Sequence, residues 1–67
     1  MIEQQNLQIS LAAARVNAGL TQEDVAKALN VSKNTVVNWE KYKTEMSITQ
    51  AKELEKLYGI SINNIRT

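Results

Sequence analysis

Residues 22–41, QEDVAKALNVSKNTVVNWEK, contain two segments with helical spacing that meet at a short polar turn. The small side chain of Ala26 suits the point where two helices approach most closely. Asn30 suits the turn, because asparagine tolerates a left-handed backbone better than other non-glycine residues. Apolar residues would lock the two helices together: Val25, Leu29, Val31, Val36 and Trp39. The pattern predicts a helix-turn-helix unit whose helices cross at about 90–120°.

Capping residues predict where these two helices begin and end. Thr21 and Asp24 have the spacing of a capping box, so the first helix of the pair starts at Thr21 and stops near Leu29. Ser32 can cap the second helix, which is expected to run to about Tyr42.

Toward the N-terminus, apolar spacing predicts a further helix over residues 7–18. Its buried face would comprise Leu7, Leu11, Ala14 and Ala18. Asn6 can cap the start of this helix. Gly19 follows its end, where a residue that tolerates positive φ is favoured.

Toward the C-terminus, polar residues 43–46 predict a loop, and Ser47 with Gln50 forms a second potential capping box. The helix that follows is expected from Ile48 to about Tyr58, and Gly59 ends it. A short final helix capped by Ser61 would hold Ile60, Ile62 and Ile65. No segment has strand character. The sequence therefore predicts an all-α, compact five-helix bundle that forms one domain over residues 1–67.

The composition argues against an enzyme. The 67 residues include no cysteine and no histidine, which excludes disulfides and thiolate zinc sites and removes the commonest general base. Neither a serine nucleophile motif nor a glycine-rich phosphate loop is present. Eight Lys and Arg residues nearly balance seven Asp and Glu residues, which still permits a local nucleic-acid-binding surface. We expect no catalytic residues, no cofactor and no metal.

Membrane and secretion signals are not visible in the sequence. The N-terminus lacks the basic start and apolar run of a signal peptide, and no apolar stretch reaches the roughly 18–20 residues needed to span a bilayer. We expect a cytoplasmic protein that associates with the nucleoid and not with membranes.

Three runs of residues fit one family pattern together: Gly19-Leu20-Thr21-Gln22-Glu23-Asp24-Val25-Ala26, Leu29-Asn30-Val31-Ser32 and Val36-Val37-Asn38-Trp39-Glu40. With them the chain resembles the lambda-repressor-like, Cro-type (XRE) helix-turn-helix family over about residues 7–65. The resemblance implies a five-helix bundle and a sequence-specific regulator of transcription that binds double-stranded DNA. A repressor of phage, prophage or bacterial origin is the expected role.

The helix predicted after Ser32 would read DNA bases. Val36 and Trp39 must face inward, so its outer side presents Lys33, Asn34, Val37, Asn38 and Lys41. Asparagine can pair with adenine, lysine can donate to guanine, and an aliphatic group can touch a thymine methyl. Family members line the major groove with these positions, which implies base reading by Lys33, Asn34, Val37 and Asn38. The alternative is an ordinary solvated helix face.

Phosphate contacts are expected on both sides of that helix. Free backbone amides at a helix N-terminus attract anions, and the resemblance implies a backbone contact by the glutamine next to the cap. Lysines follow the base-reading helix on its other side. The expected phosphate-binding residues are Thr21, Gln22, Ser32, Lys41, Lys43 and Thr44. The alternative is capping for Thr21 and solvation for the lysines.

Glu40 lies on the inward side of the same helix, where an unpaired carboxylate is costly. Arg15 is the basic residue of the N-terminal helix, and residues at these two positions form an ion pair in the family. We predict a structural salt bridge between Arg15 and Glu40. The alternative is a pair of separate, solvated charges.

Tight DNA binding would need two copies of the chain. One helix-turn-helix module buries about 600–1,000 Å² on DNA, so a homodimer on an inverted-repeat operator is expected, at least when DNA is bound. Candidate dimer contacts are Tyr58, Ile60, Ile62 and Ile65. The alternative is that the isoleucines complete the core of the monomer.

Two other functions fit the same pattern. One is an antitoxin of this fold, which binds a toxin protein and represses its own operon. The other is a helix-turn-helix module that is used for protein contacts alone. A neighbouring toxin gene would favour the antitoxin, and a protein bound to the outer face of the second helix would favour the interaction module.

Overall fold

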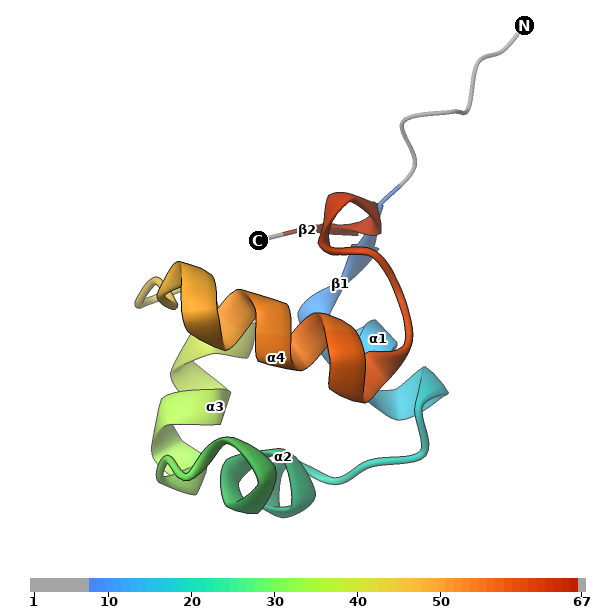
Figure 1. Ribbon diagram of the computed structural model, residues 1–67. Helices are drawn as coiled ribbons and strands as arrows, with labels where there is room; N and C mark the ends of the chain where they lie inside the picture. The colour runs from blue at the N-terminus through green and yellow to red at the C-terminus, as the bar shows by residue number, and fades with distance from the viewer. Residues whose placement is uncertain (1–7, 67) are drawn as a thin grey trace, which may run out of the picture.

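The computed structural model describes residues 8–66, which fold mainly into α-helices (Figure 1). In chain order the elements are β1 (Ile9–Ser10), α1 (Leu11–Asn17), α2 (Gln22–Leu29), α3 (Lys33–Glu40), α4 (Ile48–Tyr58), the 3₁₀ helix η1 (Ile62–Asn64) and β2 (Ile65–Arg66). Figure 1 shows α4 across the middle of the molecule, with α2 below it, α3 at the left and the two strands above. No helix within the described range is long and apolar enough to cross a membrane.

The predicted caps of α2, α3 and α4 are confirmed. The Thr21 hydroxyl accepts the Asp24 amide at 3.0 Å, and the Asp24 carboxylate accepts the Thr21 amide at 2.8 Å. Ser47 and Gln50 form the second capping box in the same way. The Ser32 hydroxyl accepts a backbone N–H in the first turn of α3. Side chains a few residues apart therefore fix all three helix starts.

Within residues 8–66 each α-helix is followed by a residue in the left-handed backbone region: Gly19, Asn30, Tyr42 and Gly59. The predicted ends at Gly19, Asn30 and Gly59 are confirmed. The helix α3 ends at Glu40, earlier than the predicted end near Tyr42, because Tyr42 itself has a φ of 58° and cannot continue the helix.

The core lies where the helices and β2 meet. In the described chain it consists of eight buried apolar residues: Leu11, Ala14, Val25, Ala26, Val36, Trp39, Leu54 and Ile65. Half of these residues come from α2 and α3. The orientation of the helix-turn-helix is therefore fixed by the main core and not by a surface contact.

The N-terminal helix starts later than predicted. It begins at Leu11 and not at residue 7, because the Ser10 hydroxyl accepts the Ala13 amide at 3.0 Å and caps it there. The expected cap Asn6 and the expected first residue Leu7 lie outside the described residues.

A parallel strand pair, which the sequence did not predict, joins the two ends of the described chain. Ile9 lies opposite Ile65, and Ser10 lies opposite Arg66. The predicted final helix is reduced to the 3₁₀ turn of η1, capped by Ser61. The all-α prediction holds for most of residues 8–66, but the count of five helices is not confirmed, because this range has four α-helices. Strands of two residues are too short to show alternation in a sequence.

Candidate nucleic-acid interface

The helices α2 and α3 form the helix-turn-helix predicted from residues 22–41. Val25 on α2 is 0% exposed and Trp39 on α3 is 3% exposed, so the facing sides of both helices are sealed. In the turn between them, the Val31 amide donates to the Ala26 carbonyl at 2.9 Å, and Asn30 has the left-handed backbone that this bond requires. Packing on one side leaves the opposite side of α3 toward solvent.

The outer side of α3 carries the residues that were expected to read bases. Lys33 and Asn34 are exposed in the first turn, and Val37 and Asn38 are half-buried one turn later. Lys41 is exposed at the C-cap. Amide and ammonium groups therefore surround one aliphatic side chain on a single helical face.

Two hydroxyls that were expected to bind phosphate act as helix caps. The Thr21 hydroxyl caps α2. The hydrogen bond that the Thr21 backbone amide donates to the Asp24 carboxylate, followed by the contact with the Thr21 side chain, lowers the pKa of that carboxyl group. The Ser32 hydroxyl caps α3 and lies 2.9 Å from the hydroxyl of Thr35. The cap hydroxyls take the third amide of each helix, those of Asp24 and Thr35, so the first two backbone amides of each helix are the groups left to receive an anion.

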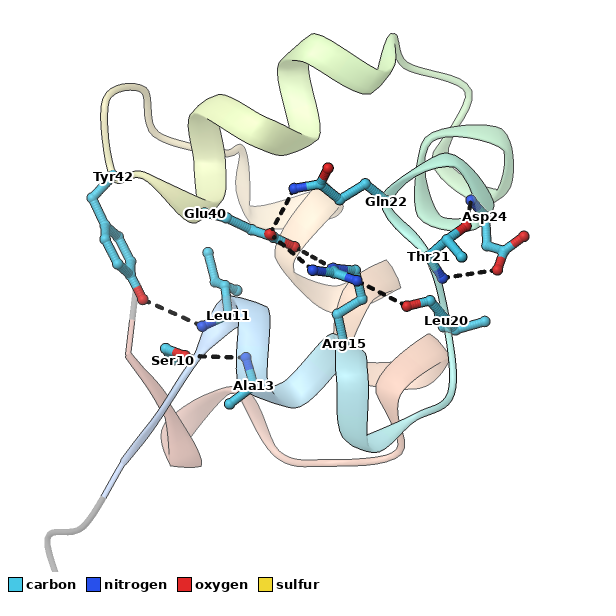
Figure 2. Close-up of polar contacts among 10 residues, drawn as sticks. All are labelled: Ser10, Leu11, Ala13, Arg15, Leu20, Thr21, Gln22, Asp24, Glu40 and Tyr42. Carbon is cyan, nitrogen blue, oxygen red and sulfur yellow. Dashed lines mark hydrogen bonds and ion pairs between the residues drawn. The ribbon is translucent and has the colours of Figure 1, made fainter.

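Glu40, the last residue of α3, is the centre of a polar network (Figure 2). Nε of Arg15 donates to Oε2 of Glu40 at 2.6 Å, and Nη2 donates to Oε1 at 3.3 Å. Nη1 of Arg15 donates to the Leu20 carbonyl at 3.0 Å. The side chains of Arg15 and Glu40 are 15% and 8% exposed. The structure thus contains the ion pair that the sequence suggested, largely shielded from water.

Gln22 joins this network, which the sequence did not indicate. Its Nε2 donates to Oε1 of Glu40 at 3.0 Å, so the first residue of α2 is tied to the last residue of α3. A glutamine side-chain nitrogen carries two hydrogens, so this contact leaves a second N–H that can serve a phosphate.

Two neighbours of Glu40, Arg15 and Tyr58, have raised pKa values. The hydrogen bonds that Arg15 donates to the Glu40 carboxylate raise the pKa of Arg15 above its ordinary value, so the guanidinium stays protonated. Burial, reinforced by the negative charge of Glu40, raises the pKa of Tyr58 to about 12, so that phenol stays neutral. Arg15 therefore remains a charged donor and Tyr58 a neutral neighbour in this network.

The turn after α3 presents the remaining residues that were expected to bind phosphate. Lys41, Lys43 and Thr44 are all exposed. The Tyr42 amide donates to the Trp39 carbonyl at 3.0 Å, and the Lys43 amide donates across the turn to the carbonyl of Asn38 at 2.9 Å. These two bonds form a Schellman motif, which places a left-handed residue directly after the C-cap.

Tyr42 occupies that left-handed position, and the sequence indicated no contacts for its side chain. Its hydroxyl accepts the Leu11 amide at 3.3 Å and donates to the Arg66 carbonyl at 2.9 Å. The guanidinium carbon of Arg66 lies 4.7 Å from the centre of the Tyr42 ring, within cation–π range. One feature of the sequence hinted at this role. No glycine or asparagine follows Glu40 directly, so another residue had to take the left-handed position that ends α3.

The expected dimer residues divide into two groups. Ile65 is 1% exposed and belongs to the core, so its assignment as a dimer contact is wrong: β2 turns its side chain inward. Tyr58, Ile60 and Ile62 are half-buried and pack against the core, which leaves part of each side chain at the surface.

The described residues offer no metal centre, because they contain no cluster of three or more suitable ligands. A groove of about 270 Å³ lies between Trp39 and the start of α4, with Met46 and Ile48 on its wall. The groove contains none of the residues expected to read bases, so it is separate from the outer side of α3.

Comparison with known proteins agrees with this geometry. A family model described as "Helix-turn-helix" matches residues 11–65. A protein of Methanocaldococcus jannaschii, described as an uncharacterized HTH-type transcriptional regulator, is 44% identical over 46 residues, which cover 69% of this chain and 70% of that relative. No solved structure gave a significant match.

The paired helices and the polar outer side of α3 define a helix-turn-helix protein. The chain belongs to the lambda-repressor-like helix-turn-helix family of transcriptional regulators.

Proposed function

We propose that this chain binds a specific double-stranded DNA sequence and represses transcription there, with α3 as the recognition helix in the major groove. The observation that carries the proposal is the outer side of α3. Its polar residues stand opposite a fully packed inner side, so the helix can enter a groove without disturbing the core.

Four side chains on this helix would read bases. Asn34 and Asn38 can each make a bidentate contact with adenine, and Lys33 can donate to guanine. Val37 lies between them and can contact a thymine methyl group. The exposed residues of the first turn would reach furthest into the groove, because residues near the start of a recognition helix contact the base edges.

Phosphate contacts would fix the recognition helix in position. On one side, the first-turn amides of α2, the second N–H of Gln22 and the first turn of α3 behind Ser32 would bind one stretch of backbone. On the other side, Lys41, Lys43 and Thr44 would bind a second stretch. Thr21 would contribute to phosphate binding indirectly, because its cap holds the first turn of α2 in place.

A homodimer would supply the second recognition helix. Two protomers would place their α3 helices about 34 Å apart on one face of DNA, so the operator would be an inverted repeat. The half-buried surface of Tyr58, Ile60 and Ile62 is the proposed contact.

Selection of bound duplexes from a random DNA library, followed by sequencing, tests the proposal. The expected result is an enriched inverted repeat. A protein with both Asn34→Ala and Asn38→Ala should lose the enrichment. Asn64→Ala, which changes an exposed asparagine of η1, is the matched control and should retain it. The absence of any enriched sequence at moderate salt would contradict DNA reading and would favour a protein-binding role.

Repression and pairing are tested with the selected duplex. A reporter gene placed behind it should lose expression when the chain is present, and increased expression would contradict a repressor. Sedimentation of the complex should show two chains per duplex. A single chain on an inverted repeat would contradict the dimer.

A further inference from the structure

The turn after α3 differs from the other helix ends. Among the left-handed residues that follow the α-helices of the described chain, Tyr42 is the one that is neither glycine nor asparagine. A bulky residue is rare in this backbone region, because its Cβ crowds the neighbouring carbonyl. Such a residue persists where surrounding contacts hold it, and such positions concentrate at functional sites.

Contacts of the Tyr42 side chain provide that hold. The hydroxyl bridges the Leu11 amide, at the start of α1, and the Arg66 carbonyl, in β2, while the guanidinium of Arg66 lies over the ring. Figure 2 shows the ring extending from the end of α3 to the first residue of α1. One side chain thus ties the turn to both ends of the described chain.

The turn also sets the positions of two cations. Lys41 is the C-cap before Tyr42, and the Lys43 amide is held by the Asn38 carbonyl. If Tyr42 relaxed to negative φ, the chain after it would change direction and this hydrogen bond would break. The tie to β2 and α1 opposes that relaxation.

We infer that Tyr42 is a positioning residue for DNA binding, which holds Lys41 and Lys43 against the phosphate backbone by anchoring their turn to the paired strands. The inference rests on the proposed function. Tyr42 itself need not touch DNA, because its hydroxyl is already engaged within the protein.

A double-mutant cycle on the selected duplex tests this role. Tyr42→Phe keeps the ring over Arg66 but removes both hydroxyl contacts, and it should raise Kd about three- to tenfold, as expected for the loss of one or two hydrogen bonds. Lys43→Ala should also raise Kd. The double variant should bind more tightly than the sum of the two single losses predicts, because part of the effect of Tyr42 passes through that lysine and the rest through Lys41. Tyr42→Phe should also flatten the salt dependence of binding.

Two controls separate positioning from general stability. Lys56→Ala, in an exposed position on α4, should combine additively with Tyr42→Phe. Tyr42→Asn favours the left-handed turn but cannot reach Arg66, so it should fold and still lose affinity. Circular dichroism would establish that each variant is folded at the binding temperature, and faster hydrogen exchange of the Leu11 amide would establish that the tie is broken.

The outcomes distinguish this inference from the proposed function. If the parent binds its selected duplex and the effects of Tyr42→Phe and Lys43→Ala simply add, the positioning role is overturned while DNA reading stands. If Tyr42→Asn binds like the parent, the role is overturned as well. If the parent selects no duplex, the proposed function fails and this inference fails with it.

Discussion

Arg15 and Glu40 connect α1 to the last residue of α3 through a 2.6 Å contact between Nε and Oε2. The same carboxylate accepts the side-chain amide of Gln22, so three helices meet at one charged group. Two members of the network, Gln22 and Glu40, belong to the two helices that would carry the DNA contacts. Changes to it should therefore affect both stability and the placement of α3.

Removal of the arginine leaves the Glu40 carboxylate poorly paired in a shielded position. Arg15→Ala should lower the free energy of unfolding by about 3 kcal/mol, the lower end of the range for a buried pair, because some water reaches the site. Urea denaturation measures the loss. Lys56→Ala, which removes an exposed charge from α4, should change stability by much less. An Arg15→Ala protein that unfolds at the parent's midpoint would show that the pair contributes nothing.

Base reading predicts a loss of sequence preference. Asn34→Ala or Asn38→Ala should cost about 1–3 kcal/mol on the preferred duplex and relax the choice of base at one position. Titration of the preferred duplex and of random DNA, at one salt concentration, gives both affinities. Equal weakening on the two DNAs would exclude the altered residue as a base reader.

Phosphate binding predicts the opposite pattern. Lys43→Ala should weaken binding to all sequences about equally, and it should reduce the slope of log K against log salt concentration by about one. The measurement is affinity across a salt series on two unrelated duplexes. A loss confined to the preferred duplex would assign Lys43 to base reading instead.

The capping box of α2 makes stability depend on pH in the acid range. Because the folded protein lowers the pKa of Asp24 below 3.8, its carboxylate stabilises the fold above that value, and the benefit disappears as pH falls through the lower folded pKa. Asp24→Asn should therefore be less stable than the parent at neutral pH, and the difference should shrink in acid. Urea denaturation over a pH series checks this.

A neighbouring variant provides the comparison for Asp24. Glu23→Gln removes a negative charge from the same first turn without touching the capping box, so at neutral pH it should cost less than Asp24→Asn. A parent–variant difference for Asp24→Asn that stays constant down to about pH 2 would contradict the pKa assignment.

Local signals made the helix-turn-helix predictable. The caps of α2 and α3 bond to groups only a few residues away, and Asn30 ends α2 through its own backbone conformation. These roles can therefore be recognised in the sequence. The outer side of α3 followed from the inward-facing Trp39 and Val36, since helical periodicity fixes the opposite side.

The features that the sequence did not reveal depend on contacts between distant parts of the chain. β1 pairs with β2, and strands of two residues carry no periodic pattern. Ile65 appeared free for a partner because nothing nearby in sequence showed that β2 would turn it into the core. The contact of Gln22 with Glu40 and the contacts of Tyr42 likewise arise only when the helices have packed.

The parallel pairing of β1 with β2 has a consequence for the order of folding. Nearly the whole described chain separates Ile9 from Ile65, so closing this contact early would cost far more loop entropy than joining α2 to α3 across a short turn. We expect the helix-turn-helix to contribute to the folding transition state, with the strand pair closing after it. Mutations in the strands would then mainly speed unfolding. The pairing of β1 with β2 would therefore control the unfolding rate, and with it the lifetime of the folded state.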